Sequence, residues 1–190
     1  MTTFEFVFAF YSIVASLAVT HMLAGYVNLR RAKSVRVYAP QLMWASAAFT
    51  IPIANWASLW ELRLMTNWPN WSFLLLIASG LCQYLFCAFL TPDTRLGEDM
   101  DLRSYYEKNR IIFFAVFTAS CAVDTAANFA FGGTDHFDIW LRNQLFTVLA
   151  FLTAVFSFLV RPDWLRNAAS AIMLAKMTYF LIIATNLLAG

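Results

Sequence analysis

Six long apolar runs determine what this chain can fold into. A helix needs about 20 apolar residues to cross the ~30 Å core of a bilayer, and each run is long enough. The runs cover residues 4–29, 40–64, 70–91, 108–132, 138–160 and 166–189. The chain is 61% hydrophobic and 13% charged, whereas a soluble domain averages about half and a quarter. The sequence therefore predicts an all-α, polytopic integral membrane protein, with residues 1–190 forming a single bundle of six transmembrane helices.

Basic residues are concentrated in alternate connections between the runs. The first connection carries four, the third four and the fifth two, while the second and fourth carry none. Cytoplasmic loops of membrane proteins are enriched in Lys and Arg. The odd connections are therefore expected in the cytoplasm, with both termini on the non-cytoplasmic side of the cell membrane (the inner membrane in a bacterium). The first run lacks a basic segment before it, so it is interpreted as a membrane helix rather than a signal peptide.

Local signals refine the helix ends. Asp101 is suited to N-cap an extension of the fourth helix into the preceding connection. Gly132 and Gly133 are suited to end that helix. Pro52 lies midway along the second helix, where it is expected to kink the helix and free the carbonyl of Ala48.

Polar side chains within the runs form three layers when depth is counted at ~1.5 Å per residue. An outer layer holds Glu61, a middle layer holds Asn55, Asp124 and Asn128, and an inner layer holds His21, Gln83 and Lys176. An ionisable group inside a membrane costs at least a few kcal/mol, so it indicates a functional site. The candidates for a transport relay are therefore Lys176, Asp124, His21, Gln83, Asn128, Asn55 and Glu61.

Lys176 and Asp124 are the two charged residues at the greatest depth. Lys176 is placed about 6 Å nearer the cytoplasm by the same count, a distance that its side chain can span. If the fourth and sixth helices are neighbours, the two residues can pair. Such a pair is either a structural ion pair that fixes helix register or part of a proton or ion relay, and the sequence leaves both open.

The first connection carries Arg30, Arg31, Lys33 and Arg36. This cluster is explained by topology, and it is also a candidate site for anionic lipid head groups, at roughly 1 kcal/mol per charge. No basic surface of the size that nucleic acid requires is indicated.

Motifs of known catalytic or cofactor sites are missing from the sequence. It contains no H-E-x-x-H, G-x-S-x-G or P-loop pattern and no paired carboxylates. Cys82, Cys87 and Cys121 lie in apolar runs, as small buried hydrophobic residues do. His21 has no second histidine within a run, so no haem or other metal site, and no cofactor, is expected.

The leading hypothesis is a channel or transporter for protons, ions or a small solute. The alternative is a non-catalytic accessory or scaffold subunit, as part of a homo-oligomer or a larger membrane complex. A lysine in the last helix near an aspartate also has the chemistry of a retinal Schiff base and its counter-ion, but six runs rather than seven argue against it. Short similarities, such as residues 8–12 with 114–118, leave an inverted repeat of two three-helix halves open.

Overall fold

The computed structural model describes residues 2–65, 68, 71–93, 97–132 and 137–186, and its fold is all-helical, as predicted. The helices are α1 (Thr3–Arg30), α2 (Ala39–Ser58), α3 (Ser72–Leu90), α4 (Leu102–Gly132), α5 (Phe137–Leu159) and α6 (Asp163–Asn186). A 3-10 helix, η1 (Leu59–Leu64), continues α2. Two three-residue strands, β1 (Ser34–Arg36) and β2 (Asp99–Asp101), lie in the first and third connections.

The predicted helix ends are mostly correct to within a few residues. One of the two largest differences is at α4, which begins at Leu102 rather than residue 108. The backbone N–H groups of Arg103 and Ser104 point to Asp101 Oδ1, at 3.0 and 3.4 Å, so the predicted N-cap is confirmed. The second helix was predicted to run to residue 64, but its last six residues form η1 instead. Residues 70 and 187–189 of the predicted runs lie outside the described residues.

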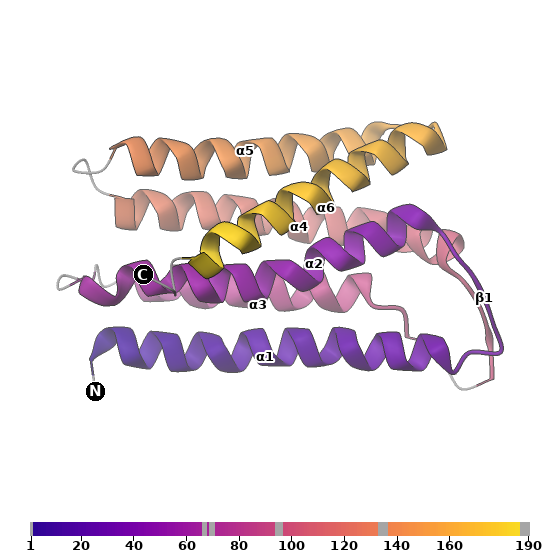
Figure 1. Ribbon diagram of the computed structural model, residues 1–190, viewed down its shortest axis with the longest axis horizontal. Helices are drawn as coiled ribbons and strands as arrows, with labels where there is room; N and C mark the ends of the chain where they lie inside the picture. The colour runs from indigo at the N-terminus through magenta and orange to yellow at the C-terminus, as the bar shows by residue number, and fades with distance from the viewer. Residues whose placement is uncertain (1, 66–67, 69–70, 94–96, 133–136, 187–190) are drawn as a thin grey trace.

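The helices are arranged in a closed ring. Each packs on its neighbours in the order α1, α3, α4, α5, α6 and α2, and α2 closes the ring on α1 while also touching α3. In Figure 1, α2 and α6 cross in front of α3 and α4, with α1 and α5 at the two edges. The strands lie at one end, which we call the strand end; α1 begins at the opposite end, which we call the far end.

Four helices of the described residues are long and apolar enough to cross a membrane: α1, α3, α4 and α6, with mean hydropathy between 1.6 and 2.1. Large apolar side chains cover the outside of the bundle; Ile13 on α1, for example, is 62% exposed and Leu74 on α3 is 65% exposed. Soluble monomers rarely expose such continuous apolar surface.

Helix α2 packs on α1, α3 and α6 and also touches α4. Its buried positions are mostly alanines, whose small side chains allow close helix approach. The large exception is Trp44, which is 0% exposed and lies among the rings of Phe86, Phe113, Phe114 and Phe117. Pro52 lies inside α2, and the Ala48 carbonyl accepts a hydrogen bond from the Cys87 thiol on α3 at 3.3 Å. The carbonyl that proline leaves unpaired is thus used between helices.

The strands pair in parallel, with Ser34 opposite Asp99 and Arg36 opposite Asp101. The Ser34 hydroxyl donates to Asp99 Oδ1 at 2.8 Å. The sequence did not indicate these strands. They join the basic first connection to an acidic part of the third, so opposite charges face each other across the pair.

Because Gly25 has no side chain, α1 lies in close contact with Thr91 at the end of α3. A Cβ at Gly25 would lie 1.9 Å from Thr91 Cγ2, and Thr91 is held by the hydrogen bond from its hydroxyl to the Cys87 carbonyl at 2.8 Å. We expect Gly25→Ala to lower the free energy of unfolding by about 1–3 kcal/mol, measured by denaturation in detergent micelles.

Two further variants test this explanation. Thr91→Ser removes the clashing methyl group and is expected to restore most of the stability of Gly25→Ala. At Gly80 the added Cβ would meet Val14 at an ordinary 3.4 Å, so Gly80→Ala is the matched control with a small effect. If Gly25→Ala left the free energy of unfolding unchanged, the close contact between Gly25 and Thr91 would be contradicted.

Candidate functional site

A chain of hydrogen bonds between buried and half-buried polar groups links three helices in the half of the bundle nearer the far end. The Tyr11 hydroxyl on α1 donates to Gln83 Oε1 on α3 at 2.7 Å. Gln83 Nε2 donates to Ser79 Oγ at 3.1 Å, and the Ser79 hydroxyl donates to Asp124 Oδ1 on α4 at 2.7 Å. Ser120, one turn from Asp124, lies 3.5 Å from its Oδ2. We call Tyr11, Ser79, Gln83, Ser120 and Asp124 the Asp124 cluster.

A fourth helix completes the surroundings of the cluster. Asn55 on α2 lies near the Tyr11 hydroxyl. At ~1.5 Å per residue, Tyr11, Ser79 and Asp124 lie about 10–12 Å from the far ends of their helices. The cluster is therefore well inside the apolar part of the bundle, where unpaired polar groups are costly.

The chemistry of the cluster centres on Ser79. Its hydroxyl accepts from Gln83 and donates to Asp124, so it presents its proton to the carboxylate. Hydroxyl groups both donate and accept, whereas an amide has separate donor and acceptor atoms. Ser79 and Ser120 therefore donate hydrogen bonds to the Asp124 carboxylate, while Gln83 orients Ser79 and is held by Tyr11.

Gln83 belongs to this cluster rather than to an inner layer with His21 and Lys176, as the depth count predicted. The reason is the direction of side chains on a helix. They point toward the helix N-terminus, which for α3 is at the far end. The long Gln83 side chain therefore reaches back one turn to Ser79, and its amide lies nearer Asp124 than its backbone does.

Lys176 has partners other than Asp124. Its Nζ donates to the Phe146 carbonyl on α5 at 2.5 Å and lies 4.4 Å from the centre of the Phe146 ring. Helix α6 packs on α2 and α5 rather than on α4, so the condition for a Lys176–Asp124 pair is not met. Among the side chains that the structure describes, no basic one forms an ion pair or hydrogen bond with Asp124.

The other candidates lie apart from the cluster. His21 is exposed on the outside of α1, with its ring 6.1 Å from that of Tyr84. Glu61 is exposed in η1. Asn128 lies one turn beyond Asp124 on α4 and is half-buried. Of the seven predicted relay residues, the structure brings together Asp124, Gln83 and Asn55.

A second polar group lies at the strand end. Arg166, whose side chain is 7% exposed, pairs with Glu107 on α4 and donates from Nε to the Val160 carbonyl at 2.9 Å. Its Nη1 also lies 3.4 Å from the Tyr38 hydroxyl. This ion pair ties the start of α6 to α4 and to the chain before α2. Because it connects the ends of helices far from Asp124, its role is structural.

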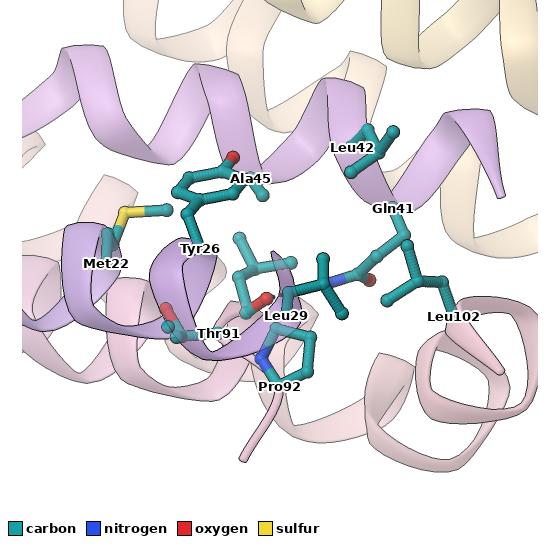
Figure 2. A pocket seen from close by; sticks show the side chains of 11 residues that line it. Met22, Tyr26, Leu29, Gln41, Leu42, Ala45, Thr91, Pro92 and Leu102 are labelled. Carbon is teal, nitrogen blue, oxygen red and sulfur yellow. Dashed lines mark hydrogen bonds between the residues drawn. The ribbon is translucent and has the colours of Figure 1, made fainter. Parts of the chain in front are cut away.

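Figure 2 shows a pocket at the strand end, between α1, α2, the end of α3 and the start of α4. Its walls are mostly apolar, with Tyr26, Leu29 and Leu102 among them. The space open to a water-sized molecule is about 10 Å³, which is about what one water needs. Gln41 lines it and donates to the Leu90 carbonyl at 2.7 Å. The pocket is too small for a substrate and does not include Asp124.

Sequence reasoning did not identify Tyr11 or Ser79 as site residues. Ser79 and Gln83 are four residues apart, as Ser120 and Asp124 are, so each pair shares one helix face. Two polar pairs with this spacing on consecutive helices were the available signal. Nothing comparable marks Tyr11.

Comparison of the chain with protein-family models, curated proteins and solved structures finds no match.

Proposed function

We propose that this chain is a six-span membrane protein that moves a proton or a small ion across a cell membrane by way of Asp124. The observation that carries the proposal is the hydrogen-bonded chain from Tyr11 through Gln83 and Ser79 to Asp124. Among the side chains that the structure describes, Asp124 has no basic partner, and an unpaired carboxylate inside an apolar bundle is expensive. Its presence there is accounted for if it takes up and releases a positive charge.

The proposed topology places the strand end in the cytoplasm and both termini on the other side. Three observations support it: four helices are long and apolar enough to cross a membrane, β1 and β2 pair the first and third connections, and basic residues are concentrated in the odd connections. Because strands that pair must lie on the same side of a membrane, the first and third connections are assigned one side.

The exposed side chains of Arg30, Arg31, Lys33 and Arg36 are proposed to contact anionic lipid head groups at this face. The acidic residues of β2 offset part of this charge. The proposed contact is therefore centred on Arg30 and Arg31, which precede the strand pair.

Flux through proteoliposomes tests the proposed function. A potential is imposed across vesicles that contain purified protein, and proton flux is followed with an internal pH dye and sodium flux with an internal sodium dye. We expect the wild-type protein to conduct, and Asp124→Asn to reduce the rate at least tenfold because the amide cannot carry the charge. Thr178→Val is the matched control, since the Thr178 hydroxyl is exposed and bonds within its own helix.

Three outcomes would overturn the proposal: no proton or sodium flux in the wild type, unchanged flux in Asp124→Asn, or equal losses in Asp124→Asn and Thr178→Val.

Lys176→Met tests whether Lys176, which lies apart from Asp124, contributes to the flux. We expect it to keep most of the flux. If Lys176→Met abolished the flux and Asp124→Asn did not, the conducting residue would be Lys176.

A second candidate is a non-catalytic accessory or scaffold subunit, in a homo-oligomer or a larger membrane complex. The observation that favours it is that Tyr11, Gln83, Ser79 and Asp124 satisfy one another, as a structural clasp between helices does. Purification in mild detergent separates the two candidates. A partner protein in fixed stoichiometry, with no flux from the isolated chain, supports the scaffold.

A further inference from the structure

The oxygen atoms around Asp124 resemble a ligand set for a small hard cation. Ser79 Oγ lies 2.7 Å from Oδ1 and Ser120 Oγ lies 3.5 Å from Oδ2. The Gln83 amide lies one hydrogen bond further, at 3.1 Å from Ser79 Oγ. Carboxylate, hydroxyl and amide oxygens are the donors that hard cations prefer. All four side chains come from two adjacent helices, α3 and α4.

Charge balance favours a monovalent ion. Asp124 is the one carboxylate of the cluster, and no basic group compensates it among the side chains that the structure describes. Lys176 is held at Phe146 instead. One carboxylate balances one positive charge, whereas all-protein sites for calcium contain several carboxylates. Nowhere in the described part of the chain are three or more His, Cys, Asp or Glu residues grouped to hold a metal ion.

Rotation of the serine hydroxyl groups and of the Gln83 amide is enough to turn their oxygen atoms toward a bound cation. A serine hydroxyl has one donor and two acceptor lone pairs, so turning its hydrogen away from Asp124 presents a lone pair to an ion. A half-turn of the Gln83 amide exchanges Oε1 and Nε2 and adds a third neutral oxygen. The Tyr11 hydroxyl then accepts from the amide nitrogen, at the position where it now donates to Oε1.

We propose that Asp124, Ser79, Ser120 and Gln83 form a binding site for one sodium ion. This rests on the proposed function, since it names the ion that the transport site takes. Sodium is favoured over potassium because the oxygens already lie within hydrogen-bonding distance of one another. A smaller ion therefore requires less separation of α3 from α4.

The sodium site can be tested by measuring how sodium changes the thermal stability of the purified protein. This measurement does not depend on transport. Thermal unfolding in detergent is measured with increasing sodium chloride, and ionic strength is held constant with N-methyl-D-glucamine chloride. A parallel series uses potassium chloride. A ligand that binds the folded state raises its stability. We expect the midpoint to rise by about 3–6 °C when sodium reaches ten times its Kd and to continue rising with the logarithm of the sodium concentration, and we expect a clearly smaller rise with potassium.

Variants of the proposed ligands test whether the rise in the unfolding midpoint comes from sodium bound at this site. Asp124→Asn is expected to lose the sodium response, and Ser79→Ala to weaken sodium binding at least tenfold. Ser79→Thr keeps the hydroxyl and is expected to keep the response. Ser16→Ala is the matched control, since the exposed Ser16 hydroxyl bonds to its own helix. If Asp124→Asn does not fold, the site is tested by comparing the sodium response of Ser79→Ala with that of Ser79→Thr.

Equal midpoints in sodium, potassium and N-methyl-D-glucamine would overturn the site, as would a full sodium response in Asp124→Asn or in Ser79→Ala. The outcomes remain separate from those of the flux assay. Proton flux through Asp124 without any sodium effect on stability overturns the sodium site and leaves the proposed function standing. Sodium-dependent stability without flux overturns transport and leaves the sodium site standing.

Discussion

Glu107→Leu is expected to lower the free energy of unfolding by about 2–4 kcal/mol, because it leaves the Arg166 guanidinium buried without its counter-ion. Breaking a buried ion pair by removing one partner costs about 3–5 kcal/mol. Glu107 is 39% exposed, so water reaches the pair and the expected cost is lower. The measurement is chemical denaturation in mixed micelles, supported by a fall in the thermal midpoint of about 2–4 °C per kcal/mol.

Two comparisons separate loss of the ion pair from loss of packing. The double variant Glu107→Leu with Arg166→Met replaces both charges by apolar groups, and we expect it to be more stable than Glu107→Leu alone. Arg103 pairs with Asp163 at 2.9 Å, but the two side chains are 58% and 46% exposed. Arg103→Ala should therefore cost at most about 1 kcal/mol. Equal effects of Glu107→Leu and Arg103→Ala would contradict the prediction.

Trp44→Ala is expected to have the largest effect on stability, about 3–5 kcal/mol, by opening a cavity at the centre of the ring of helices. Trp44 contacts phenylalanine rings on both α3 and α4, and its Nε1 lies 3.3 Å from Ser157 Oγ on α5. Lipid cannot fill a cavity that other helices enclose, so the lost dispersion contacts are not replaced. The measurement is the same denaturation assay.

Two controls accompany this variant. Trp44→Phe keeps an aromatic ring and loses the contact with Ser157, so an intermediate effect is expected. Trp164 has the same side chain but is 70% exposed, and Trp164→Ala should change the free energy of unfolding by less than about 0.5 kcal/mol. If the two alanine variants were equally stable, Trp44 would not be the centre of the packing.

The helices themselves could be predicted because their signals are local. Length and hydropathy located all six, since each apolar run is a single helix or a helix with a 3-10 extension. The Asp101 cap depends on residues two and three positions away. The position of the freed carbonyl follows from Pro52 alone. Each of these features is determined within a few residues of chain.

Features that depend on which helices are neighbours could not be predicted. The sequence placed Lys176 and Asp124 at compatible depths, but in the structure Lys176 donates to the Phe146 carbonyl on α5 rather than to Asp124 on α4. Gln83 was placed by its backbone depth, although its long side chain reaches a full turn away. The strands could not be predicted because each has only three residues and the two are 65 residues apart in the sequence. The Asp124 cluster needs three helices to be assembled before its hydrogen bonds exist.

The parallel strand pair also has a consequence for biosynthesis. When β1 leaves the ribosome, β2 is still 65 residues from being made, and in the proposed topology α2 and α3 enter the membrane as a hairpin in the interval. The strands can meet only if that hairpin crosses completely and returns to the side on which it started. A chain with one helix left uninserted would keep an unpaired strand edge, with free N–H and C=O groups, at the surface. In the proposed topology the strand pair therefore reports on insertion, because it cannot close on a chain in which one helix of the α2–α3 hairpin has stayed out of the membrane.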